Sequence, residues 1–141
     1  MNQFAEQPSQ SRSALHPALN AMLICDQAIR EEGTGKVSLI GIFENINARQ
    51  FPLRLGFLCV YAKLTDAEGQ YDIRLELVRL ENLLAIGQGQ LMITVEDRMA
   101  PVEIIFQLSG LVFAEPGRYE FRLYANEKSV GIKSFTVVQV T

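Results

Sequence analysis

The stretch Glu115–Tyr124 constrains the fold of this chain more than any other, because it joins a tight turn directly to a strand. Pro116 presets the backbone angle φ, and Gly117 accepts backbone angles that a β-branched residue could not adopt. The apolar residues that follow fall on alternate positions, so they share one face of a strand. They are Tyr119, Phe121 and Leu123. This arrangement is typical of a corner in a β-sandwich.

The same pattern of strands and turns recurs along most of the chain. Alternating apolar residues predict strands over 21–30, 37–43, 53–64, 71–77, 83–95, 102–108 and 132–140. A helix is the weaker alternative for the first of these segments. The turn formers of Glu31–Lys36 follow it, so we expect the first two strands to pair antiparallel. Short strands separated by turns, with no long helical period, predict an all-β fold of the antiparallel β-sandwich type.

Two of the predicted strands have features that suggest their place in a sheet. Residues 53–64 are apolar on both faces, which predicts a strand that lies centrally or faces a partner. Residues 83–95 contain Gly87 and Gly89. Glycines inside a strand predict a bulge or a close approach of another part of the backbone.

The length of the chain, 141 residues, fits one domain that can bury a core without disulfides or metal ions. Residues 1–17 are polar and show no period, so we predict a flexible polar N-terminal tail and a single β-sandwich domain over 18–141. Hydrophobic residues make up 48% of the chain, and the mean hydropathy is slightly high for a soluble protein of this size. Formation of an oligomer would explain this excess.

The charged residues argue against several classes of partner. There are 13 Lys and Arg residues against 16 Asp and Glu residues, with a net charge of −3, and the two signs are interspersed. Phosphate backbones are bound by grouped cations, so we expect no nucleic-acid partner and no membrane partner. The longest apolar runs are far shorter than the ~20 residues of a membrane helix. Since the N-terminus does not read as a secretory signal, we expect a cytoplasmic protein.

Three short motifs resemble reactive sites but lack residues that the chemistry needs. The string Gly33-Thr34-Gly35-Lys36 is similar to part of a phosphate-binding loop, yet Arg30 and Val37 occupy the positions that require Gly and Ser or Thr. His16 is the one histidine of the chain, which is too few for a histidine metal site or a catalytic triad. Ser109-Gly110 lacks the preceding Gly-x of a nucleophile elbow. We therefore predict no catalytic, cofactor-binding or metal-binding residues and no cofactor.

Cys25 and Cys59 leave several interpretations open: a redox pair, half of a zinc site, an inter-sheet bridge, or two buried and inert thiols. We favour the buried thiols, because free cysteine is among the most buried residue types. Antibody-type domains carry the second bridge cysteine two residues after the corner tyrosine, where this chain has Phe121. Carboxylates occur in turns or on polar faces, at Asp66, Glu68, Asp72, Glu96 and Asp97. They lack the pattern of a calcium loop and are expected in solvent.

Aromatic residues are the best candidates for a binding surface in this chain, because aromatic side chains often anchor interfaces. The candidates are Phe51, Tyr61, Tyr71 and Tyr124. Tyr124 follows the inward Leu123, so we expect it to point outward beside Arg122 and to mark an exposed patch. A small ligand or a carbohydrate bound near Tyr61, Tyr71 or Tyr124 is the alternative to a protein partner.

Two stretches resemble a known family. They are Asn20–Asp26, which leads through Gly35–Phe43 to Phe51-Pro52, and Pro116–Phe121. The likeness covers about residues 20–138 and points to an uncharacterised bacterial single-domain family, a domain of unknown function. The resemblance implies a compact immunoglobulin-like β-sandwich and transfers no functional residues.

The function expected from the sequence is that of a soluble, non-enzymatic β-sandwich. It would present a surface or a strand edge to another protein, and a second copy of the chain is one candidate partner. This expectation rests on residues 53–64, the high hydrophobicity and the lack of a reaction site.

Overall fold

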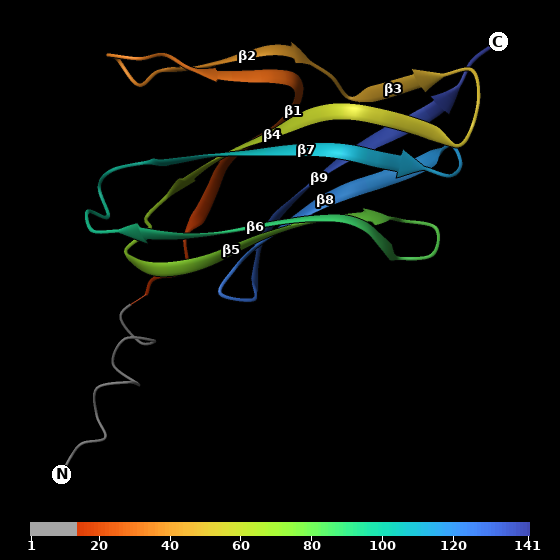
Figure 1. The fold of residues 1–141 in the computed structure, drawn as a ribbon. Coiled ribbons are helices and arrows are strands. Elements are labelled where there is room, and N and C mark those ends of the chain that lie inside the picture. Colours follow the sequence, from red (N-terminus) through yellow and green to blue (C-terminus); the bar gives the residue numbers. More distant parts are fainter. Residues whose placement is uncertain (1–13) are drawn as a thin grey trace.

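A computed structural model of the protein describes residues 14–141 and shows two β-sheets packed face to face (Figure 1). The predicted all-β immunoglobulin-like sandwich is confirmed. The predicted tail lies mostly outside the described residues. The strands are β1 (Ala18–Arg30), β2 (Val37–Ile42), β3 (Asn45–Ala48), β4 (Leu53–Thr65), β5 (Gly69–Arg79), β6 (Leu84–Val95), β7 (Val102–Phe113), β8 (Gly117–Ala125) and β9 (Lys128–Gln139).

The strands form a four-stranded sheet in the order β2-β1-β4-β7 and a five-stranded sheet in the order β3-β9-β8-β5-β6. Strands β2, β7, β3 and β6 are therefore the edges. The pairing is antiparallel, as predicted, with one exception. Strand β3 was not predicted and pairs with β9 in parallel, with Ile46 opposite Val137. The chain thus moves from one sheet to the other between β2 and β3.

The core lies between the two sheets and is built from the residues that alternate in the sequence. Tyr119, Phe121 and Leu123 of β8 are all fully buried, as the corner pattern predicts. The ring of Phe121 stacks on Phe135 of the neighbouring strand, with centroids 5.4 Å apart. This aromatic pair occupies the region where antibody-type domains have a bridge cysteine.

The corner before β8 has the hydrogen bond that the Pro-Gly turn is expected to support. The hydroxyl of Tyr119 donates to the backbone oxygen of Glu115 over 2.6 Å. In immunoglobulin-like sandwiches, a tyrosine near the start of strand F that hydrogen-bonds the backbone a few residues upstream is a hallmark, and Tyr119 at the start of β8 makes such a bond. The bond satisfies a phenol that would otherwise be buried without a partner.

The prediction that residues 53–64 lie centrally in a sheet is confirmed. Strand β4 lies between β1 and β7. Leu58 and Val60 point into the core between the sheets, whereas Cys59 and Tyr61 point to the outer side of the four-stranded sheet. A central strand is apolar on both faces when its outer side is also covered, as it is at Cys59 and Tyr61.

The prediction for Gly87 and Gly89 is also confirmed. The register of β5 and β6 shifts next to Gly87, between Leu77 and Val78 on the partner strand. A Cβ atom at Gly87 would lie 2.9 Å from Leu111 of β7, and one at Gly89 would lie 2.8 Å from Phe106. The glycines therefore allow the edges of the two sheets to approach closely.

Residues 14–17, which we assigned to the tail, contact the sandwich. The amide of Leu15 donates to the backbone oxygen of Glu68, and the hydroxyl of Tyr71 donates to the backbone oxygen of Leu15 over 2.6 Å. Pro17 is buried. Tyr71 therefore holds residues 14–17 against the turn between β4 and β5, whereas the rest of the predicted tail lies outside the described residues.

Strand β1 changes partners along its length. Its first half pairs with β4 as far as Cys25, which lies opposite Cys59. Its second half pairs with β2, beginning with Cys25 opposite Ile42. Beyond Cys25 the strands β1 and β4 separate like a fork, and the β1–β2 hairpin lies on the side of β4 and β7 away from the five-stranded sheet (Figure 1).

Candidate interaction surface

The β1–β2 hairpin exposes three isoleucines on one face. Ile29, Ile40 and Ile42 have exposed fractions of 42%, 48% and 52%. The strand register places them together, because Ile40 lies opposite Gln27 and Ile42 lies opposite Cys25 in the same ladder. We call this group the isoleucine face. Large apolar side chains gathered on a surface mark interaction sites more often than scattered ones do.

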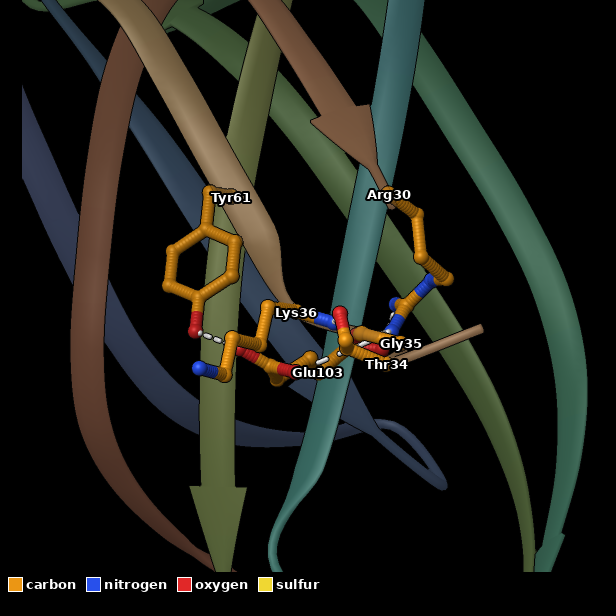
Figure 2. A network of polar contacts seen from close by, with 6 residues as sticks. All are labelled: Arg30, Thr34, Gly35, Lys36, Tyr61 and Glu103. Atoms are coloured by element: carbon orange, nitrogen blue, oxygen red, sulfur yellow. Dashed lines mark hydrogen bonds and ion pairs between the residues drawn. The ribbon is translucent and has the colours of Figure 1, made fainter. Parts of the chain in front are cut away.

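The opposite face of the hairpin is turned toward the four-stranded sheet. Ala28, Val37 and Leu39 on this face are partly buried. At the end of β1, Arg30 donates to the backbone oxygen of Glu103 over 3.4 Å and forms an ion pair with its carboxylate at 3.7 Å. Figure 2 shows Arg30 and Glu103 meeting in front of β7.

A network of polar contacts holds the tip of the hairpin over the sheet (Figure 2). Arg30 also donates to the backbone oxygen of Gly35 over 3.1 Å, so it links the turn of the hairpin to β7. The hydroxyl of Tyr61 on β4 donates to the Glu103 carboxylate over 2.5 Å. Burial and this hydrogen bond raise the pKa of Tyr61 to about 12. The phenol therefore stays protonated at neutral pH and remains a donor.

The outer face of the five-stranded sheet has the opposite character. Arg74 pairs with Glu76 and Glu127, and Arg122 pairs with Glu120. The guanidinium of Arg74 also lies 4.2 Å from the ring centroid of Tyr124. Most charged side chains named on this face therefore form ion pairs with one another, so few charges remain free to pair with another protein. The contrast makes the hairpin the better candidate for an interaction surface.

A pocket opens at the fork between β1 and β4. This fork pocket has a volume of about 290 Å³. It is lined by residues of the hairpin, by Phe43, by the start of β3 and by the first half of β4. Ile42 and Phe57 line this pocket and are also exposed at the surface, Phe57 with an exposed fraction of 45%. The pocket and the isoleucine face are therefore continuous.

The two cysteines are brought together by the fold. Cys25 and Cys59 are free thiols on paired strands, and both are fully buried. Burial and then the neighbouring Cys59 raise the pKa of the Cys25 thiol. They lie within one sheet, so an inter-sheet bridge of the antibody type is excluded. The preferred interpretation, two buried thiols, agrees with their burial.

The tyrosines proposed for a ligand site are not brought together. Tyr61 lies under the hairpin network, Tyr71 is buried at the N-terminal end of the sandwich, and Tyr124 lies on the outer face of the other sheet. Tyr124 does point outward as predicted, but Arg74 covers its ring, so it is not the freely exposed residue that we expected. Phe51 is partly buried against the core.

The remaining candidates lie in loops or turns. Gly33–Lys36 forms the hairpin turn, where Gly33 and Gly35 have φ angles of 90° and 72°. The carboxylates expected in solvent differ in their surroundings: Asp66, Glu68, Glu96 and Asp97 are exposed, whereas Asp72 is partly buried and accepts a hydrogen bond from Gln90. Within residues 14–141, no group of three or more His, Cys, Asp or Glu side chains is placed to hold a metal ion. The same part of the chain has no helix long and apolar enough to cross a membrane.

Sequence reasoning missed the isoleucine face and the pocket. A signal was present, because Ile40 and Ile42 alternate with Leu39 and Gly41 in a segment that is apolar on both faces. Such a segment has either a buried outer side or an exposed apolar one. The pocket forms where the pairing of β1 with β4 ends, at Cys25. No pattern in the sequence marks this position.

Comparison with proteins of curated function gave no match. Among solved structures, the chain is similar to an immunoglobulin-like protein from Pseudomonas aeruginosa, with 14% identity, a TM-score of 0.44 and coverage of 87% of this chain and 97% of that chain. It is also similar to part of a β-glucosidase from Listeria innocua, solved in complex with isofagomine. There the identity is 10% and the TM-score 0.41, and the match covers 89% of this chain but only 17% of the β-glucosidase.

The family comparison covers nearly the whole sandwich. The model of a family of unknown function, DUF6941, matches residues 20–138, which run from the third residue of β1 almost to the end of β9. The motifs that carried the resemblance in the sequence lie within this range. The chain is a member of the DUF6941 family.

Proposed function

We propose that this domain is a non-enzymatic protein-interaction module that associates with a second copy of itself through the isoleucine face. The observation that carries the proposal is the set of three half-exposed isoleucines on one face of the β1–β2 hairpin. Such a face lowers its free energy when another apolar surface covers it.

Self-association is favoured over an unrelated partner by the charges of the hairpin. Strand β2, Val37–Ile42, contains no charged residue and no proline, and it is an edge strand. In a twofold dimer each surface meets its own copy, so a charged patch would oppose itself whereas an apolar patch is complementary to itself. Edge strands of monomeric proteins usually carry a charge, a proline or a bulge that prevents such contact.

The size of the face predicts a weak complex. Full burial of an isoleucine contributes about 1.5–3 kcal/mol, so covering a half-exposed one contributes roughly 1 kcal/mol. Six side chains from two copies give roughly 6 kcal/mol before the cost of association is subtracted. We therefore expect a dissociation constant between roughly 0.1 and 1 mM, reached only if contacts of Phe57 and its neighbours offset part of the association cost.

Sedimentation velocity over a range from micromolar to near-millimolar protein tests the proposal. The wild-type sedimentation coefficient should rise with concentration toward that of a dimer, and Ile42→Lys should stay monomeric. Ile132→Lys is the matched control, because Ile132 has an exposed fraction of 53% but lies opposite Arg122 on the other sheet. A wild-type protein that stays monomeric throughout, or a control that loses association equally, would refute self-association through this face.

The remaining parts of the proposal rest on the sequence. We infer that the module is not an enzyme and needs no cofactor, because the chain has one histidine and no catalytic motif. We also infer no nucleic-acid or membrane partners, since the cations are dispersed and the net charge is −3. Two buried free cysteines suit a reducing, cytoplasmic compartment. Fractionation of the native cell, followed by detection of the protein, tests the compartment.

A further inference from the structure

The fork pocket arises because one strand serves two partners. After Cys25, β1 pairs only with β2, so the first half of β4 has no β1 neighbour from Leu53 to Leu58. Phe43, just before β3, and Asn45, the first residue of β3, line the gap from the other side. The result is a concave site of about 290 Å³, which is at the lower end of the size of pockets for small ligands.

The walls of the pocket are mostly apolar and partly aromatic. Phe57 and Ile42 form its exposed rim, and Phe43, partly buried against the core, lies deeper. Aromatic rings attract cations through the negative potential of their faces, in addition to burying apolar surface.

One charge stands in this apolar setting. Among the described residues that line the pocket, Asp26 alone is charged. The Asp26 carboxylate occupies the space that a Cβ atom at Gly41 would fill. Asp26 can therefore line the pocket only because residue 41 is glycine. Within residues 14–141, Asp26 makes no hydrogen bond or ion pair through its side chain, unlike Asp72, which accepts a hydrogen bond from Gln90.

We propose that the fork pocket binds a small organic cation, an ammonium or guanidinium group carried on an apolar or aromatic body. The cationic group pairs with the Asp26 carboxylate, the apolar body contacts Ile42 and Phe43, and Asn45 supplies a second polar contact. A neutral ligand of the same shape loses the charge pairing, and an anionic ligand meets Asp26 with the same sign. This ligand class extends beyond the protein-interaction role and does not require it.

The probe that tests this inference is phenethylamine, with 2-phenylethanol and phenylacetate as neutral and anionic compounds of similar size. Each is titrated into isotopically labelled protein and followed by NMR chemical-shift changes, at a protein concentration where sedimentation shows only monomer. Phenethylamine should bind best and shift the amides of Asp26, Gly41 and Phe57. Because Asp26 is exposed to solvent, which weakens charge pairing, the advantage over the alcohol should be about fivefold in dissociation constant.

Two variants make the result decisive. Asp26→Asn keeps the shape of the side chain and should bring phenethylamine to the affinity of the alcohol. Asp72→Asn, on the polar face of the other sheet, should leave all three affinities unchanged. The inference is overturned if the amine and the alcohol bind equally, if Asp26→Asn keeps the preference, or if no probe shifts the pocket amides. Loss of self-association in Ile42→Lys is measured separately, so failure of one proposal does not imply failure of the other.

Discussion

Cys25 and Cys59 lie directly opposite each other on the paired strands β1 and β4, and neither side chain is exposed to solvent. Cys25 is also the last residue of β1 that pairs with β4 and a residue that pairs with β2. The thiol pair therefore marks the root of the hairpin, and access to the thiols reports on whether the hairpin stays closed over the sheet.

We expect both thiols to resist a thiol-reactive dye in the native protein at pH 7. Burial removes them from the reagent, and the raised pKa of Cys25 lowers its thiolate fraction further. Labelling followed by mass spectrometry should find neither cysteine modified in buffer and both modified in denaturant. Ser38→Cys, on the exposed side of β2, should label rapidly and serves as the control. Rapid labelling of Cys25 in the native state would show that the hairpin opens readily.

The tyrosine corner offers a test of stability at a single hydrogen bond. Tyr119→Phe keeps the buried ring and removes the 2.6 Å bond to Glu115, so we expect a loss of about 1–2 kcal/mol in the free energy of unfolding. Urea denaturation measures the change. Tyr124→Phe, on the outward side of the same strand, should cost less than about 0.5 kcal/mol. Equal losses in the two variants would contradict a special role for the corner.

Because the sheets approach closely at β6, we expect replacement of Gly89 by alanine to destabilise the fold and replacement of Gly56 to have little effect. In Gly89→Ala the new methyl group would lie 2.8 Å from a ring carbon of Phe106, and the strain should cost about 1–3 kcal/mol. Gly56→Ala is the control, because a Cβ atom there meets no heavy atom within 4 Å. Thermal unfolding of both variants should therefore show a clear decrease in Tm for Gly89→Ala alone.

The contact between Tyr61 and Glu103 predicts a dependence of stability on alkaline pH. The pKa of Tyr61 is about 12 in the folded protein against 10 for the free group, so the folded state holds this proton more tightly. The contribution of the Tyr61 phenol to the free energy of unfolding is therefore fully present below pH 10. It is lost as the pH rises through 12.

The measurement compares wild type with Tyr61→Phe, since all other titrating groups are shared. The difference between their free energies of unfolding should shrink from pH 9 to pH 11. A difference that stays constant over this interval would show that folding does not raise the pKa of Tyr61.

The sequence predicted most strands of this sandwich because their residues carry a local period. Alternation in 71–77 and the Pro116-Gly117 turn identify a strand and a corner that the structure reproduces. Strand β3 was missed because its alternation of Asn45 and Asn47 with Ile46 and Ala48 spans only four residues, and asparagine is depleted in strands. Its pairing with β9 is also distant in sequence. Local patterns do not encode such pairings.

The candidate site was less predictable than the fold. The segment Val37–Ile42 was correctly identified as a strand, but nothing local indicates that β2 is an edge or that Ile40 lies in solvent. The pocket required three separate segments to meet around Asp26. Tyr124 was expected to be free because its partner, Arg74, is distant along the chain.

The continuity of β1 through the fork links the surface to the interior. Residues Ala18–Cys25 belong to the sheet over the core, and the same strand carries Ile29 into the hairpin. A mechanical load on the hairpin would therefore run along the backbone into the central strands, where shear across several hydrogen bonds resists it.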